Sequence, residues 1–214
     1  MHSIFEILDE STDSAGPDLI SLDDLKLALG ITDTSEDAAL QAAITMQSRL
    51  IADYCNRRFG RAEALEIFTF DRGETILPRQ ALVLKLYPVV EVFEVSSLGA
   101  TAGDYDFDPD SGRLWTTVGG WMLDYPGSWG GTISVTYSGG YDLPEEAPAR
   151  LQQAVIQAVN DTRTIGARDP SIREVQHGDT RISYFTPQLS SASSGFLSAG
   201  VTDLIKPYRR LHVA

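Results

Sequence analysis

The stretch from Val135 to Val155, VTYSGGYDLPEEAPARLQQAV, contains the transition that decides the fold. Its first residues are strand-like and stop at the pair Gly139 and Gly140, where the backbone can turn without a Cβ clash. An acidic turn with prolines follows, and apolar residues then recur at helical spacing. Glu145 and Glu146 complement the positive end of that helix. The stretch therefore predicts a joint between a sheet and a helix, and it needs no catalytic role to explain it.

Upstream of the joint, residues 62–140 read as a series of short strands and turns. Val90–Val95 alternates between apolar and acidic residues, which is typical of a half-buried strand. The segments Tyr105–Asp108 and Arg113–Trp115 flank a Pro-Asp-Ser-Gly sequence, which is hairpin chemistry. These patterns predict a small β-rich insertion.

Helices are predicted on both sides of this insertion. Ser21 is a suitable N-cap for a short helix that ends at Gly30, and Thr34 or Ser35 precedes a longer helix that ends near Tyr54. The helix after the joint has a face of small and apolar residues suited to close packing, made of Leu151, Ala154, Val155, Ala158 and Val159. The fold class expected is α+β: a small helical bundle interrupted by a β-rich insertion, with a flexible C-terminal docking segment.

The chain divides into parts by these changes of pattern. Residues 187–200 are rich in Ser, Ala and Gly, which indicates a flexible linker. The predicted parts are an N-terminal arm (1–18), a helical core (19–61 and 141–186), the β-rich insertion (62–140), the linker (187–200) and a C-terminal docking segment (201–214).

Composition restricts the function. The 214 residues carry a formal charge of −13, which argues against a protein that holds phosphates by bulk attraction. Acidic residues crowd the first 40 positions while bases gather in the tail, so copies of the chain could bind head to tail. A solvated acidic face is the simpler alternative. Cys55 is the only cysteine, which suits a reducing cytoplasm, and neither a signal peptide nor a membrane span is expected.

One cluster of carboxylates invites a metal or catalytic interpretation: Asp104, Asp106, Asp108 and Asp110 alternate along the chain. An EF-hand counted from Asp106 would need Gly at position 111 and Glu at 117, but Ser111 and Thr117 stand there. Alternation also places the carboxylates on one face of a strand, where solvent exposure explains them. Since no histidine or glycine motif completes a site, we expect no catalytic residue, cofactor or metal.

Aromatic residues concentrate in the second half of the insertion. Trp115, Trp121, Trp129 and Tyr125 could form a platform on which a sugar stacks. Small β units also need large aromatic side chains to fill their core, and this is the interpretation we favour.

Five segments in this order resemble the head–tail connector proteins of long-tailed double-stranded DNA phages and of phage-like gene transfer agents, also called adaptor or head-completion proteins. SLDDLKLALGITDTSEDAALQAAITMQSRLIADYCNRRFG is similar to the opening helix pair of that family, and YDFDPDSGRLW to its inserted hairpin. TISVTYSGGYDLPEEAPARLQQAV resembles its strand-to-helix joint, EVQHGDTRISYF the segment after its third helix, and IKPYRRLHV its ending.

The resemblance implies a structural protein rather than an enzyme, located in the neck of a virion or virus-like particle. It implies a homo-oligomer, a dodecameric ring, docked on the portal of a DNA-filled head and extending the DNA channel toward stopper or tail proteins. Double-stranded DNA would pass without sequence-specific binding. The alternatives are a metal-assisted hydrolase that uses the Asp104–Asp110 carboxylates and a carbohydrate-binding module that uses the tryptophans.

The C-terminal segment is the predicted portal-docking element. It is too short to be a stable helix alone and carries apolar and basic side chains side by side. We expect it to order on binding, with the contacts made by Leu204, Ile205, Tyr208, Arg209 and Arg210. Packing on its own subunit is the alternative. On the docking hypothesis, deletion of residues 201–214 is expected to leave a folded chain that no longer attaches to heads.

Overall fold

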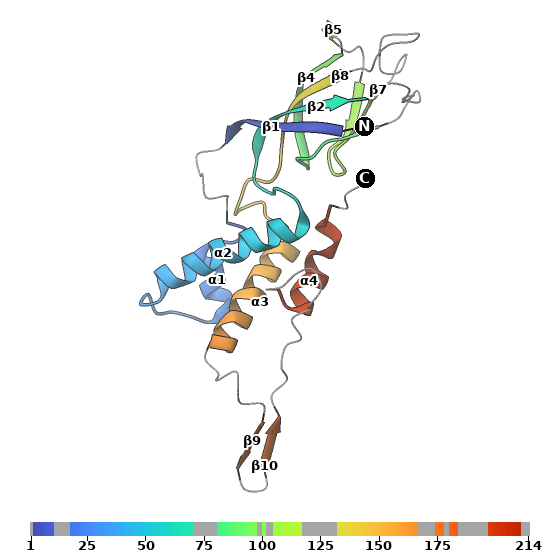
Figure 1. Cartoon of the computed structure of the whole chain (residues 1–214). Helices are drawn as coiled ribbons and strands as arrows, with labels where there is room; N and C mark the ends of the chain where they lie inside the picture. Colours follow the sequence, from blue (N-terminus) through green and yellow to red (C-terminus); the bar gives the residue numbers. More distant parts are fainter. Residues whose placement is uncertain are drawn as a thin grey trace. The chain divides into compact units, whose positions relative to one another are not determined.

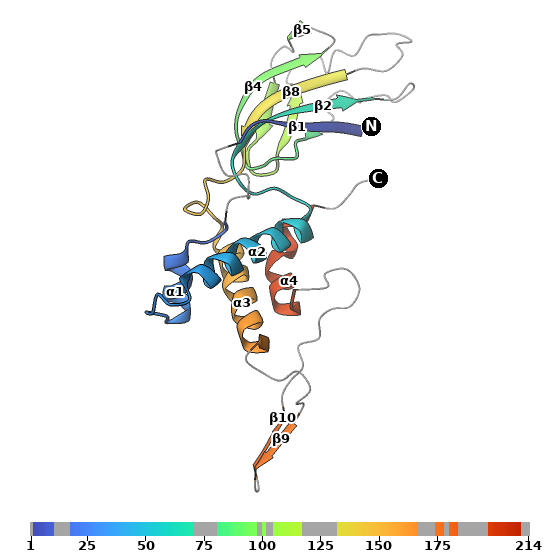
Figure 2. The same cartoon turned by 60° about the vertical axis from the view of Figure 1, so that its left-hand side comes forward.

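The computed structural model describes residues 2–10, 18–70, 81–97, 100–101, 105–116, 132–166, 174–177, 180–183 and 197–210. The chain forms two compact units, one of strands (residues 1–14 and 58–142) and one mainly of helices (residues 15–57 and 143–214). Figures 1 and 2 show the strands and the helices of these units. The α+β fold class predicted from the sequence is confirmed.

The strand unit contains two antiparallel sheets. The larger has the order β1-β2-β8-β4-β5, with β1 His2–Glu10, β2 Ala62–Thr69, β8 Thr132–Gly139, β4 Val89–Ser97 and β5 Ala100–Thr101. The smaller has the order β3-β7-β6, with β3 Leu82–Val83, β7 Arg113–Thr116 and β6 Tyr105–Asp108. Strands β6 and β7 form the hairpin expected around the Pro-Asp-Ser-Gly turn.

A hydrophobic cluster joins the two sheets. Inward-facing side chains of β2 and β8 meet those of the segment around β3 and of β7. The alternating exposure along β2 and β8 follows from the two-residue repeat of a strand, which sends successive side chains to opposite faces. Members of the cluster that are fully buried include Ala64, Leu84, Leu86, Leu114, Ile133 and Val135.

The N-terminal residues differ from the expected arm. Residues 2–10 form β1, which pairs with β2 in the register Ile4 to Ile67 and Glu6 to Leu65. Phe5 and Ile7, on the inner face of β1, pack against the hydrophobic cluster. Residues 4–8, IFEIL, are mostly apolar on both faces and do not alternate cleanly. The partner strand β2 lies some sixty positions away, so the local pattern alone did not reveal the strand.

The glycine pair of the joint sits where backbones converge. A Cβ on Gly139 would lie 2.5 Å from the carbonyl oxygen of Leu86, and one on Gly140 would lie 2.5 Å from that of Gly60. Gly140 also has φ of +93°, which side-chain-bearing residues rarely adopt. Its N–H donates to the carbonyl of Pro88 at 2.8 Å. The pair is therefore explained by close backbone packing within the strand unit.

The helical unit contains α1 Leu22–Leu29, α2 Asp37–Cys55, α3 Ala149–Gly166, α4 Ala199–Ile205 and the 3₁₀ helix η1 Lys206–Tyr208. Ser21 caps α1 by accepting a hydrogen bond from the N–H of Asp24 at 3.1 Å, and Gly30 ends it in the left-handed conformation. Helix α3 contacts α1, α2 and α4 (Figures 1 and 2). A Gln47 Nε2 to Thr162 Oγ1 hydrogen bond of 3.3 Å also links α2 to α3.

The predicted packing face of α3 lies inside the helical unit. Leu151, Ala154, Val155 and Val159 are fully buried, and Ala158 is 5% exposed. Small side chains at this face let the neighbouring helices approach closely. After α3, the strands β9 Glu174–His177 and β10 Thr180–Ser183 form an antiparallel hairpin. Most of the predicted linker lies outside the described residues, and its last residues, from Leu197 on, lead into α4.

Candidate functional site

The C-terminal segment begins as a capped helix packed on α3. Ser198 Oγ accepts from the N–H of Val201 at 3.5 Å and donates to Asp161 Oδ2 of α3 at 2.7 Å. Val201 and Ile205 are fully buried. Tertiary packing therefore stabilises a helix that is too short to persist alone.

The residues after α4 are held on the C-terminal end of α2. The Arg210 N–H donates to the Cys55 carbonyl at 2.8 Å, and the Arg209 guanidinium lies 5.3 Å from the centre of the Tyr54 ring. Cys55 is itself buried, and burial raises the pKa of its thiol to about 11, so the thiol stays protonated at neutral pH. The segment up to Arg210 is thus part of the helical unit in the free chain.

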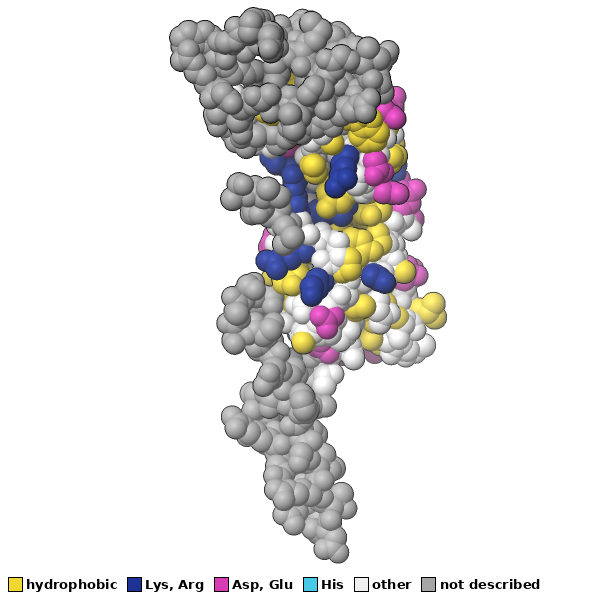
Figure 3. Space-filling model, turned by 90° about the vertical axis from the view of Figure 1, so that its right-hand side faces the viewer, with side chains coloured by type: hydrophobic (Ala, Val, Ile, Leu, Met, Phe, Trp, Pro, Cys, Tyr) yellow, Lys and Arg dark blue, Asp and Glu magenta, His cyan; other side chains and the backbone are white. Residues whose placement is uncertain are grey.

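The sequence predicted that Ile205 contacts a partner, and this packing shows that it is buried instead. The neighbouring residues differ from one another in exposure. Ile205 faces its own subunit and is not available to a partner. Leu204, Tyr208 and Arg210 are half-buried, whereas Lys206 and Arg209 are exposed. The charged side chains exposed after α4 are therefore basic, and half-buried apolar side chains lie beside them in the sequence. Figure 3 shows Lys and Arg side chains among hydrophobic ones on one face of the molecule.

Two of the hairpin carboxylates, Asp106 and Asp108, accept local hydrogen bonds. Asp108 accepts from the Ser111 hydroxyl at 2.5 Å and from the Asp110 N–H at 3.2 Å. The Ser111 hydrogen bond holds the pKa of Asp108 below its usual value. Asp106 accepts from the N–H of Phe107 at 2.9 Å, and Asp104 lies outside the described residues. The bond from the Asp110 N–H to Asp108 is that of an Asx turn.

The described part of the chain contains no group of three or more His, Cys, Asp or Glu side chains placed to hold a metal. Of the aromatic residues considered as a sugar platform, Trp115 in β7 is half-buried. Trp121, Tyr125 and Trp129 lie outside the described residues. Over the described ranges, no helix is both long and apolar enough to cross a bilayer.

Sequence reasoning missed a buried polar cluster in the strand unit. Glu66 is fully buried and accepts hydrogen bonds from Ser3 Oγ at 2.9 Å and from the Lys85 N–H at 2.9 Å. Tyr137, also fully buried, donates to Glu66 at 3.3 Å and accepts from the Leu86 N–H at 3.0 Å. Lys85 Nζ lies 3.6 Å from the Glu66 carboxylate. A carboxylate in this position is tolerable because several donors and a cation surround it.

The cluster also fastens β1 to the sheet. Lys85 Nζ donates to the Ser3 carbonyl at 3.2 Å and lies 5.6 Å from the centre of the Phe5 ring. The sequence did contain a sign that Glu66 is buried: in a strand it lies on the same face as Ala62, Ala64 and Phe68, which are all buried. The arrangement joins β1, β2 and β8 through side chains that hydrogen-bond to one another.

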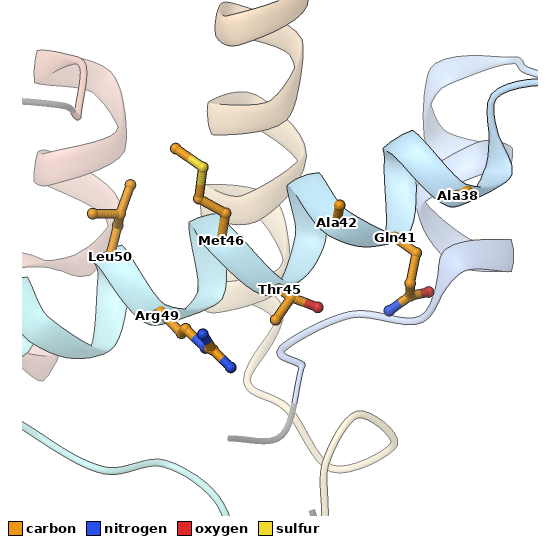
Figure 4. A pocket seen from close by; sticks show the side chains of 7 residues that line it. All are labelled: Ala38, Gln41, Ala42, Thr45, Met46, Arg49 and Leu50. Carbon is orange, nitrogen blue, oxygen red and sulfur yellow. The ribbon is translucent and has the colours of Figure 1, made fainter. Parts of the chain in front are cut away.

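Helix α2 has a second apolar face besides its buried one. Ala38, Ala42, Met46 and Leu50 recur every four residues along a hollow of the surface, and Gln41, Thr45 and Arg49 line its other side (Figure 4). Met46 is 54% exposed. Exposed apolar side chains at helical spacing are the usual mark of a contact surface for another helix or subunit.

The chain resembles one protein family over part of its length and solved particle structures over nearly all of it. Residues 19–87 match the family model described as phage gp6-like head-tail connector protein. No match was found among curated proteins. The chain is similar to a chain in the neck of an empty gene transfer agent particle, at 15% identity and a TM-score of 0.54, over 99% of this chain and 97% of the other.

A second solved structure, the virion of a native gene transfer agent particle, matches with the same identity, coverage and TM-score. At this identity the similarity establishes the fold, and it extends over nearly the whole chain. The resemblance to the head–tail connector family that the sequence indicates is thereby confirmed, by the family model over residues 19–87 and by the shared fold beyond them.

Proposed function

We propose that this chain is a structural adaptor in the neck of a phage-type particle. The observation that carries the proposal is the similarity, over 99% of the chain, to a neck component of a gene transfer agent particle, together with the connector family model over the opening helices. The matched family and structures are described as parts of particles rather than as enzymes, which supports a non-enzymatic role.

The adaptor is a homo-oligomeric ring, dodecameric in our proposal, located between the portal of a DNA-filled head and the stopper or tail. Double-stranded DNA passes through the ring without sequence-specific binding. The net charge of −13 supports a ring through which DNA moves without tight binding. A surface rich in phosphate contacts would retain the DNA. Neither alternative, the hydrolase or the carbohydrate-binding module, has a specific observation in its favour.

The portal-facing surface is the exposed basic part of the C-terminal segment. Lys206 and Arg209 are exposed on η1 and just after it, and Arg209 is positioned by the Tyr54 ring. Leu204, Tyr208 and Arg210 lie beside them, half-buried, and complete the contact. Charged groups held in place by their own subunit lose little conformational freedom on binding, which favours association with an acidic partner surface.

Co-sedimentation with DNA-filled heads that lack this chain tests the proposal. Wild-type protein should sediment with the heads and prevent leakage of DNA. The double variant Lys206→Glu, Arg209→Glu should melt like wild type but fail to sediment with them. Arg113→Glu, an exposed charge reversal in the strand unit, is the matched control and should still bind. Failure of the wild type to bind would contradict the adaptor function, and binding by the double variant would contradict the assignment of the docking surface.

A further inference from the structure

The exposed side of α1 carries a hydrophobic side chain between acidic ones. Leu27 is 82% exposed. Asp23 and Asp24 precede it by four and three residues, so they lie on the same side of the helix, and both are exposed. We call these three residues the α1 face. A large aliphatic side chain so fully exposed loses hydrophobic free energy unless a partner covers it.

The hollow on α2 has the complementary character. We call Ala38, Ala42, Met46 and Leu50, with Arg49 at their side, the α2 groove. The aliphatic and thioether side chains offer a surface on which an exposed leucine can pack, and Met adapts its shape to a partner. Arg49 is an exposed positive charge at the edge of the groove, where an aspartate of a partner would be attracted.

The two surfaces are distinct and rigidly related within the helical unit. The groove is lined only by α2 residues, and Figure 4 shows Met46 and Leu50 toward the end of α2 away from α1. Lys26 and Asp37, 2.7 Å apart and only 13% and 33% exposed, fix α1 against the start of α2. A chain that presents two different matching surfaces is suited to head-to-tail contact, which is the kind of interface that closes into a ring.

We propose that the α1 face of one copy seats in the α2 groove of the next copy. Leu27 packs against Met46 and its apolar neighbours, while Asp23 and Asp24 approach Arg49. Two α1 faces cannot pair with each other, because each would bring exposed aspartates against exposed aspartates. This inference rests on the ring of the proposed function and specifies which surfaces join neighbouring subunits.

The test uses single variants of the full chain in sedimentation velocity. Leu27→Glu removes the α1 face and Met46→Glu removes the α2 groove, and both positions are exposed, so thermal melting should be unchanged. Each variant alone should lose the ring that wild type forms. Ile4→Glu, a 58% exposed hydrophobic position on β1, is the matched control and should keep the ring.

Mixing the two variants gives the sharper result. A Met46→Glu chain still has an intact α1 face and a Leu27→Glu chain still has an intact groove, so one junction can form and growth must stop at a heterodimer. Charge reversal should behave in a parallel way: Asp23→Lys with Asp24→Lys, or Arg49→Glu, should prevent assembly, and the triple variant should regain part of it.

The outcomes separate this contact from the ring itself. A wild-type chain that stays monomeric at every concentration would overturn both the ring and the contact. A wild-type ring that persists in the Leu27→Glu and Met46→Glu variants would overturn the contact and leave the ring standing. Loss of the ring by Ile4→Glu to the same extent would overturn the assignment to these two surfaces.

Discussion

Lys26 and Asp37 join α1 to the first turn of α2 through an ion pair in which Nζ and Oδ1 are 2.7 Å apart. The lysine is largely shielded from solvent, so the pair is screened less than a surface bridge. The pair helps to fix α1 against the start of α2, whose first turn has no capping side chain. The arrangement leads to the first of five predictions.

Lys26→Ala should lower the free energy of unfolding by ~1–2 kcal/mol, between the values typical of exposed and of buried pairs. Urea denaturation followed by circular dichroism measures the change. Arg163→Ala is the control: its pair with Glu36 has a similar distance, 3.0 Å, but both side chains are much more exposed, at 40% and 56%. An equal loss in the two variants would show that burial is not what distinguishes them.

Ala158→Glu should disrupt the helical unit. The site is 5% exposed on the face that α3 presents to its neighbours. A buried unpaired charge is expected to destabilise by on the order of 3 kcal/mol or more. Asn160→Glu, two residues on and exposed, should change thermal melting little. Wild-type melting of the Ala158 variant would contradict this account of α3 packing.

Tyr137→Phe should destabilise the strand unit by ~1–3 kcal/mol, because the Leu86 N–H then loses its buried acceptor. Burial, with the Glu66 carboxylate beside it, raises the pKa of Tyr137 above its usual value near 10. The folded chain therefore keeps this proton while the unfolded chain releases it. The stabilisation is present below about pH 10 and is lost as pH rises further.

Urea denaturation at neutral and alkaline pH tests both statements. Wild type should lose stability above about pH 10 more steeply than the phenylalanine variant, since only wild type can ionise residue 137 when unfolded. Tyr54→Phe, half-buried in the helical unit, is the control for the loss of a tyrosine hydroxyl and should be destabilised less than Tyr137→Phe at neutral pH. Parallel pH curves for wild type and the Tyr137 variant would contradict this role of the hydroxyl.

Asp108→Asn should weaken the hairpin turn more than Asp106→Asn or Asp110→Asn, because Asp108 accepts from both Ser111 and the Asp110 N–H. Its pKa is held low by the Ser111 hydrogen bond, so its contribution is present at neutral pH and is lost as pH falls through the lowered value. NMR titration of the Asp108 carboxyl in wild type and in Ser111→Ala measures this. A pKa unchanged by the serine substitution would refute the assigned cause.

Deletion of residues 201–214 should lower stability by at least ~3 kcal/mol, because it removes the buried Val201 and Ile205 from the helical unit. This replaces the expectation, drawn from the sequence, that the truncated chain stays folded as before. Thermal melting of the truncation beside the exposed-site variant Lys206→Glu makes the comparison. If the truncated chain melts like wild type, α4 contributes nothing to the stability of the helical unit, and the segment is a docking element as the sequence predicted.

The sequence by itself determined the features whose causes are local. Helix α1 begins after Ser21 and ends at Gly30, and both ends were predictable because caps act within one turn. The apolar stripe of α3 identified its buried face, because helical spacing fixes which residues share a side. The sheet-to-helix joint and the β6–β7 hairpin follow from turn residues next to each other in the chain. These predictions depended on neighbours that the sequence displays directly.

Only the tertiary structure decided the features that depend on distant partners. β1 becomes a strand by pairing with β2, Glu66 is acceptable in the core because Ser3, Lys85 and Tyr137 reach it, and Ile205 is buried because α3 and the end of α2 meet there. A strand edge, a buried charge and a short helix are each unfavourable alone. Their stability comes from contacts between residues far apart in the chain. The periodicity of a single sequence shows only which residues share a face, so it could not predict those contacts.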